Sequence, residues 1–412
     1  MLRWLKINRY RNVVPGTELT FSEGHHVLLG PNGGGKTTLL ELIAAVLRGD
    51  FRGLKDEEFS FEYRITDGTD AAMLVQLAHA RESASDDLST PGWNDSLTAT
   101  LEHANFGKSM MVLAGDRLQI DGVEFPGQSV DLTAVGLHTN LAVHCWESHI
   151  PDGPLPYFSW LGVFRFDEAL SLFSFLRGMG TLDEKPYVSI YRTLPGAPPR
   201  ISALRHPLFA AVCLAIIEVL KHPEEDADRV TIPLPSLGSF GDIVGLLGFK
   251  SGALRAELER QTRTDKQERL TYERFQFRFV RRDGTMVLDE HLSFGQKRLL
   301  AFLFYAWAND GPIVADELVD GMHYRWIEHC LKTIRGRQAF LSSQNPLLMD
   351  FLGFDSAEKV QQTFVICDVE EHDGRERMRW RNLTGDEASE FFNAYEVGIQ
   401  HVSEILRDKG LW

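Results

Sequence analysis

The chain has 412 residues, and its 58 Asp and Glu outnumber its 43 Lys and Arg, which gives a net charge of −15. This length is enough for two or three domain-sized units with a substantial buried core. The acidic balance argues against a surface that binds nucleic acid over its whole area, although it leaves a local basic groove open.

Cysteine usage and hydropathy restrict the cellular compartment. The four cysteines are far apart and form no C-x-x-C pair, which argues against a zinc site or a disulfide framework and favours the reducing cytoplasm (Cys145, Cys213, Cys330 and Cys367). The N-terminus interleaves cations with apolar residues, unlike a signal peptide. The longest apolar stretch, 208–220, contains Glu218 and is too short to span a membrane. We therefore expect a cytoplasmic protein with no membrane segment.

The N-terminal part predicts an α/β lobe. Residues 1–50 have the pattern strand, turn, strand, glycine loop and helix. Between about 58 and 125, short β-type runs are separated by Gly, Asp and Asn, which predicts antiparallel hairpins. The polar stretch 81–96 is the segment that we expect to be a disordered insert.

The middle of the chain is expected to be mainly helical. It contains an apolar helix at 207–221, a polar helix at about 252–272, and then the strand "FQFRFVRRDG". From 291 onward the pattern is helix, strand, helix, strand, and then a hairpin that turns at Asp373-Gly374.

The tail "AYEVGIQHVSEILRDKGLW" predicts one amphipathic helix with apolar residues at helical spacing (Tyr395, Ile399, Val402 and Leu406). The predicted domain organisation has three parts: an N-terminal lobe at 1–130, an inserted and mostly helical region at 131–290, and a C-terminal lobe at 291–412.

The motif "GPNGGGKT", Gly30 to Thr37, fits the phosphate-loop pattern G-x-x-x-x-G-K-[ST] in full. Its glycines let the backbone wrap around phosphates, and the following helix directs amide dipoles at them. Lys36 is expected to reach the β- and γ-phosphates of ATP, and Thr37 to ligate Mg²⁺. The motif also brings Asn32, Gly33 and Gly35 to the nucleotide, together with Thr38 directly after it, so the sequence predicts an ATP site.

Two acids follow the apolar strand of "PIVADELVDGMH". We expect Asp316 to hold Mg²⁺ through water and Glu317 to polarise the attacking water. A strand that ends in acids is common and is often only a solvated strand end. The phosphate loop earlier in the chain favours the catalytic interpretation.

A third motif, "HLSFGQKRLL", places Ser293 before a helix that begins near Gly295. A capped helix N-terminus is a second site for an anion, although the same pattern also describes an ordinary capped helix. Ser293 precedes Asp316 by 23 residues. The phosphate loop, this serine motif (the signature) and the acidic strand follow one another in that order along the chain.

Together, "GPNGGGKT", "LSFGQ", "VADE" and "SSQNP" resemble the ABC-type ATPase head of the RecF, SMC and OLD group. The resemblance covers residues 1–50 and 290–350, and it implies a P-loop head with a mixed sheet and an antiparallel β-lobe. It also implies that ATP bridges two heads, the Ser293 signature of one subunit contacting the γ-phosphate held by the other. Within this group the chain resembles the ATPase subunits of anti-phage systems of the Septu, retron or PARIS type.

In this group Thr-His-Ser-Pro usually follows the next strand, and its histidine senses the γ-phosphate. Here "SSQNP" puts Gln344 at that position. Glutamine donates a hydrogen bond but carries no charge, so we expect slow or conditional hydrolysis. Asn345-Pro346 also suits the start of a helix, and both interpretations can hold together.

The resemblance implies a homo-oligomeric ATP switch that controls a separate effector such as a nuclease or toxin, in response to a trigger that a phage encodes. The 68 residues after Gln344 contain no Asp-x-Asp, so nuclease activity is expected in another polypeptide. A RecF- or SMC-like ATPase that acts directly on DNA is the alternative. A transporter subunit is a third reading, which the separation of 257 positions from Lys36 to Ser293 disfavours.

Overall fold

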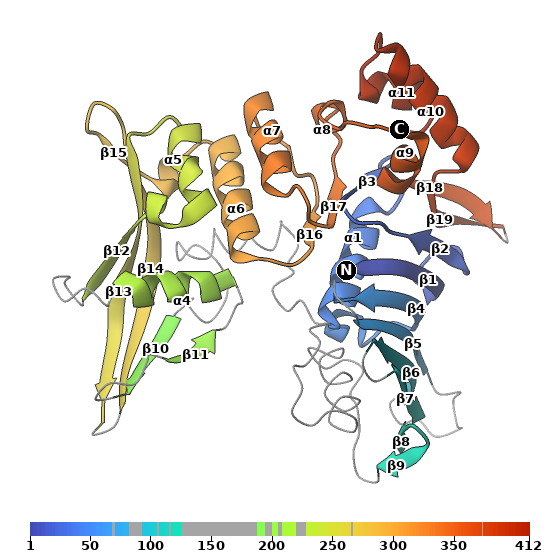
Figure 1. Ribbon diagram of the computed structural model, residues 1–412, viewed down its shortest axis with the longest axis horizontal. Coiled ribbons are helices and arrows are strands. Elements are labelled where there is room, and N and C mark those ends of the chain that lie inside the picture. The colour runs from blue at the N-terminus through green and yellow to red at the C-terminus, as the bar shows by residue number, and fades with distance from the viewer. Residues whose placement is uncertain are drawn as a thin grey trace. The chain divides into compact units, whose positions relative to one another are not determined.

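The computed structural model describes residues 1–67, 71–81, 93–104, 107–114, 117–125, 188–193, 200–204, 208–219, 228–264, 267–372 and 374–412 (Figure 1). The chain divides into two compact units. The first unit comprises Met1–Val163, Gly311–Glu317 and Gly336–Trp412, and the second comprises Phe164–Asp310 and Leu318–Arg335.

The first unit contains an eight-stranded antiparallel sheet in the order β2-β1-β4-β5-β6-β7-β8-β9. Its strands are β1 (Leu2–Tyr10), β2 (Thr17–Thr20), β4 (Phe59–Thr66), β5 (Ala71–Arg81), β6 (Trp93–His103), β7 (Gly107–Ala114), β8 (Arg117–Ile120) and β9 (Val123–Phe125). Apolar side chains alternate with polar ones, and in β4 the buried residues are every second one. The predicted hairpins between 58 and 125 are therefore confirmed. Of the polar stretch 81–96, residues 82–92 lie outside the described residues, whereas 93–96 belong to β6.

A five-stranded sheet of the first unit carries the candidate site, in the order β16-β17-β3-β18-β19. Its strands are β3 (His25–Leu29), β16 (Ile313–Ala315), β17 (Ala339–Ser342), β18 (Phe364–His372) and β19 (Arg375–Asn382). The first four are parallel, and β19 pairs antiparallel with β18. β16 and β17 are buried along their whole length, as expected for parallel strands covered on both faces.

Helix α1 (Lys36–Arg48) shares one hydrophobic core with both sheets of the first unit. Leu39, Ile43 and Leu47 of α1 are buried in that core together with Phe61 of β4 and Val314 of β16. Most faces of α1 are buried. The helix therefore anchors the C-terminal end of the phosphate loop that precedes it.

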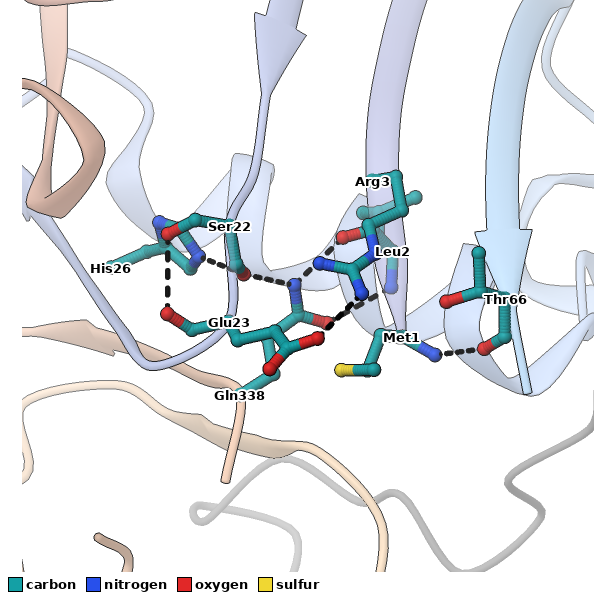
Figure 2. A network of polar contacts seen from close by, with 8 residues as sticks. All are labelled: Met1, Leu2, Arg3, Ser22, Glu23, His26, Thr66 and Gln338. Carbon is teal, nitrogen blue, oxygen red and sulfur yellow. Dashed lines mark hydrogen bonds and ion pairs between the residues drawn. The ribbon is translucent and has the colours of Figure 1, made fainter. Parts of the chain in front are cut away.

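The buried side-chain amide of Gln338 joins the first residue of β1 to the segment that leads into β17 (Figure 2). The Gln338 side chain accepts a hydrogen bond from Leu2 N–H at 2.9 Å, and it donates to the carbonyls of Leu2 at 2.7 Å and Ser22 at 2.9 Å. Burial lowers the pKa of the neighbouring His26 to about 4, so its ring is neutral where it stacks on Phe340. This network fixes the position of β17 between its neighbours.

The second unit is built on an antiparallel sheet in the order β11-β10-β14-β13-β12, and β15 pairs with β14. The strands are β10 (Val188–Thr193), β11 (Arg200–Leu204), β12 (Arg229–Pro233), β13 (Ser251–Arg263), β14 (Gln267–Val280) and β15 (Met286–Leu288). Among its described residues, the helices are α4 (Leu208–Val219), α5 (Ile243–Leu246), α6 (Phe294–Ala308) and α7 (Tyr324–Thr333). Short 3-10 turns lie at Arg52–Leu54 in the first unit and at Leu234–Ser236, Gly238–Asp242 and Asp289–His291 in the second.

The expectation of a mainly helical middle region is wrong for the part that the structure describes. The predicted helix at 207–221 is confirmed as α4, but the polar helix at 252–272 is instead β13 and the start of β14. Its Ala, Leu, Glu and Arg residues favour a helix, yet Leu254 and Ala256 alternate with more exposed residues. Pairing along β14 therefore prevails over intrinsic preference.

The C-terminal part contains the helices α8 (Leu347–Asp350), α9 (Ala357–Thr363), α10 (Gly385–Val397) and α11 (Val402–Asp408). The prediction of a single amphipathic tail helix is therefore wrong: α10 ends at Val397, the following Gly398 has a left-handed φ of 71°, and α11 begins at Val402. Ile399 is 83% exposed rather than packed. The hairpin β18–β19 is confirmed, although Asp373 of its turn lies outside the described residues. Within the described ranges no helix is long and apolar enough to cross a membrane.

Candidate nucleotide-binding site

The phosphate loop connects β3 to α1 in the first unit. Gly30, Gly33 and Gly35 have φ angles of 137°, 89° and 83°, which other residues rarely adopt. The Lys36 ammonium group donates to the carbonyls of Gly30 at 2.8 Å and Pro31 at 3.0 Å. The loop therefore wraps around the amine that the sequence assigns to the phosphates.

The backbone of β18 lies directly against the phosphate loop. A Cβ atom on Gly30 or Gly34 would lie 2.0 or 2.2 Å from the carbonyl oxygen of Cys367. Burial raises the pKa of the Cys367 thiol well above its ordinary value, and this thiol stays neutral. Gly30 and Gly34 are thus required by the close approach of a strand.

The following strand, β19, completes this support. The indole N–H of Trp380 donates to the Gly34 carbonyl at 3.0 Å in a buried hydrogen bond. A Cβ on Gly35 would lie 2.2 Å from Met378 Sδ. Side chains more than 340 residues away in sequence therefore shape the loop.

We expect Trp380→Phe to weaken ATP binding about 5- to 150-fold, because a buried carbonyl without its donor costs about 1–3 kcal/mol. Titration with a fluorescent ATP analogue measures the effect. Trp4→Phe is the matched control, since the Trp4 indole donates to exposed Glu18 on the antiparallel sheet. Equal affinities for the two variants would contradict this role of Trp380.

The acidic pair follows β16 and faces the phosphate loop. Thr37 Oγ1 donates to Asp316 Oδ2 at 2.6 Å, and the Ser342 hydroxyl donates to Asp316 Oδ1. A hydroxyl and a carboxylate side by side supply the oxygen ligands that Mg²⁺ prefers. Thr37 and Asp316 therefore fit the expected metal.

Glu317 has a left-handed backbone, with φ of 48°. This conformation costs a residue other than glycine about 1–3 kcal/mol, and such strain often occurs at functional sites. Two contacts with the end of β17 hold it: Glu317 N–H donates to Ser342 Oγ at 3.1 Å, and Gln344 N–H donates to Glu317 Oε2 at 3.0 Å.

Gln344 thus lies beside Glu317, but the contact uses its backbone amide, and its side chain is exposed. The interpretation as a helix start is also supported, because Asn345 Oδ1 accepts from Leu347 N–H at 3.1 Å at the beginning of α8. Ser343 Oγ accepts from Asn345 N–H at 2.9 Å in the same turn.

The signature residues begin α6 in the second unit. Ser293 caps this helix: its hydroxyl accepts from Gln296 N–H at 3.3 Å, and the Gln296 side chain accepts from Ser293 N–H at 2.9 Å. A Cβ on Gly295 would lie 2.1 Å from the Gly321 carbonyl oxygen, so this glycine allows close packing within the unit. Phe294 between them is 61% exposed.

The first unit therefore gathers most of the predicted site residues (Asn32, Gly33, Gly35, Lys36, Thr37, Thr38, Asp316, Glu317 and Gln344). Ser293 and Gly295 belong to the second unit. Sequence reasoning did not identify Ser342, Cys367, Met378 or Trp380. Only Ser342 carried a signal, as the first polar residue after a buried apolar run.

Comparison with known proteins places this site in context. Residues 5–106, which include the phosphate loop, match the family model described as an AAA domain. None of the curated proteins compared with the chain matches it.

Solved structures similar to this chain include heads of the SMC type. The SMC head domain from Thermotoga maritima is 12% identical, with 92% of this chain and 97% of that chain covered and a TM-score of 0.35. The Smc head from Pyrococcus furiosus, bound to the C-terminal domain of ScpA, is 11% identical, with 96% and 99% covered and a TM-score of 0.40. The recombination mediator protein RecF is 13% identical, with 92% and 98% covered and a TM-score of 0.28.

Proposed function

We propose that this chain is a cytoplasmic ATPase that binds ATP with Mg²⁺ and converts it to ADP and phosphate. One observation carries the proposal: Thr37 at the start of α1 donates to Asp316 after β16, so the phosphate loop meets an acidic strand end. The match of residues 5–106 to an AAA domain supports it.

Each residue of the nucleotide site has its own role in the proposed reaction. Lys36 binds the β- and γ-phosphates, and the loop amides around Asn32, Gly33, Gly35 and Thr38 hold the phosphate oxygens. Mg²⁺, when bound by Thr37 and Asp316, neutralises charge on these oxygens.

Glu317 accepts a proton from the attacking water, and Gln344 positions the end of β17 beside it. Because Gln344 carries no charge, the γ-phosphate gains no cationic partner from this position, and we propose that turnover is slow or conditional.

Assembly through ATP is the second part of the proposal. Ser293 caps a helix of 15 residues, whose N-terminus attracts anions, and Phe294 beside it is exposed. We propose that the Ser293–Gly295 turn of one copy contacts the γ-phosphate held by Lys36 of another, so that ATP joins two chains.

This assembly would act as a switch for a separate effector protein, such as a nuclease or toxin in anti-phage defence, and a component of the phage would be its trigger. The proposed effector and trigger are supported by the resemblance of the motifs. A test is toxicity that needs both the effector and intact Lys36 and Glu317.

A second candidate is an ATPase that acts directly on DNA. It is favoured by arginines on adjacent strands of the second unit, Arg229 of β12, Arg255 of β13 and Arg278 of β14. Burial and the nearby cations Arg255 and Arg229 lower the pKa of Arg278, whereas Glu257, which pairs with Arg255 at 3.3 Å, acts in the opposite direction. Binding to DNA that weakens steeply with salt, and is lost when Arg255 and Arg278 become glutamine, would favour this candidate.

Size measurement in solution tests the assembly. With ATP and Mg²⁺ we expect a larger species for the wild-type chain, whereas Ser293→Arg should stay at its nucleotide-free size, because a bulky cation replaces the cap. Ser251→Arg, at an exposed serine of the same unit, is the control and should assemble normally. Assembly of Ser293→Arg at the wild-type ATP concentration would refute the signature contact.

A further inference from the structure

Ser342 lies where the acidic strand and the phosphate-loop strand come together. It is the last residue of β17, which pairs with β16 on one side and with β3 on the other. Its side chain is fully buried. A hydroxyl at this position lies between the strand that precedes the acidic pair and the strand that precedes the phosphate loop.

The hydroxyl of Ser342 makes two hydrogen bonds of opposite sense. It donates to Asp316 Oδ1 and accepts from Glu317 N–H at 3.1 Å. A single oxygen atom thus contacts both acids of the pair, one through its carboxylate and the other through its backbone.

The contact with Asp316 fixes the direction of its carboxylate. Oδ1 is bonded to Ser342 and Oδ2 to Thr37 at 2.6 Å, so each oxygen has a defined hydroxyl partner. The terminal torsion of an aspartate is broad and easily rotated. Without the Ser342 contact, Oδ2 would lie beside the Thr37 hydroxyl less of the time.

The contact with Glu317 acts on its strained backbone. Glu317 N–H is held by Ser342 while φ is 48°, and its carboxylate is held by Gln344 N–H two residues further along. The end of β17 therefore holds Glu317 at both its amide and its carboxylate, which keeps the acid in one orientation.

We propose that Ser342 is a positioning residue for ATP hydrolysis, which orients Asp316 toward Mg²⁺ and holds the backbone of Glu317. This inference rests on the proposed ATPase function and deepens it. Serine side chains can bond to backbone groups of their own segment. Ser342 instead bonds across to the neighbouring strand end, at the two residues assigned to the metal and the water.

The test compares Ser342→Ala with Ser343→Ala. Both remove a buried hydroxyl, but Ser343 bonds only within its own turn to Asn345 among the contacts described above. We measure phosphate release against Mg²⁺ concentration, nucleotide binding with Mg²⁺ and with EDTA, and thermal unfolding without nucleotide.

For Ser342→Ala we expect the Mg²⁺ concentration at half-maximal activity to rise, and kcat to fall, by about 10- to 100-fold, as for other groups that orient metal ligands. Nucleotide binding in EDTA should change less than threefold. Ser342→Thr, which restores a hydroxyl, should recover most of the Mg²⁺ affinity. Ser343→Ala should show the wild-type Mg²⁺ dependence.

A Mg²⁺ dependence for Ser342→Ala equal to that of the wild type or of Ser343→Ala would overturn this inference alone. If nucleotide binding and phosphate release by the wild-type chain do not depend on Mg²⁺ at all, the proposed function itself fails, and the inference with it. The two failures are therefore distinguishable within one set of measurements.

Discussion

Lys36→Ala is expected to reduce the affinity for ATP by at least about 100-fold while the chain remains folded. The residue Lys36 is largely buried, at 9% exposure, and two loop carbonyls orient its ammonium group. Charge-assisted hydrogen bonds to phosphate contribute about 1.5–3 kcal/mol each, so the loss of two or more accounts for this factor. Calorimetric titration with ATP and Mg²⁺ measures it.

The control for this variant is Lys332→Ala, which removes an exposed ammonium group paired with Glu328 on α7. It should bind ATP like the wild-type chain, because an exposed ion pair contributes little. Circular dichroism of both variants checks the fold. Wild-type affinity in a folded Lys36→Ala chain would rule out the assigned nucleotide site.

Glu317→Gln should lower the rate of hydrolysis by about 100-fold or more and retain ATP binding. The carboxamide keeps the shape of the side chain and an oxygen that can accept from Gln344 N–H, but it cannot take the proton from water. Positioned general bases contribute about 10²–10⁴-fold to a rate. Because ATP persists, the ATP-bridged assembly should also last longer, which size measurement over time will show.

Asp310→Asn is the matched control for the glutamate, since Asp310 is an exposed acid just before β16, at the end opposite the site. We expect it to hydrolyse ATP normally. If Glu317→Gln hydrolyses ATP as fast as this control, Glu317 is not the base. The double variant Glu317→Gln with Ser293→Arg should retain nucleotide but no longer assemble. This outcome separates the retention of ATP from the assembly of two chains.

The phosphate loop could be predicted because its chemistry depends on a short contiguous pattern. The apolar runs that became β3, β16 and β17 could also be predicted, because parallel strands buried on both faces leave few polar positions. The order of these strands brings Thr37, Asp316 and the end of β17 together, as the motifs indicated.

Other features depend on contacts that no local pattern reveals. β13 carries residues with helical preference, and only its pairing with β14 makes it a strand. The supporting contact of Trp380 with Gly34 spans most of the chain. Gly398 is a local signal for the end of a helix, but the apolar residues on both sides of it keep helical spacing, and the sequence therefore predicted one helix. In the structure this left-handed glycine follows the last residue of α10.

The strand order also has a consequence for the growing polypeptide on the ribosome. β3 is made early, but both of its neighbours, β17 and β18, begin only at Ala339 and Phe364. At about 5–20 residues per second, translation needs roughly 15–70 s to reach them. Until then the phosphate loop has neither the backbone of β18 nor the indole of Trp380 behind it. Nascent chains should therefore be unable to retain ATP, and nucleotide capture becomes a late event that reports the completion of this sheet.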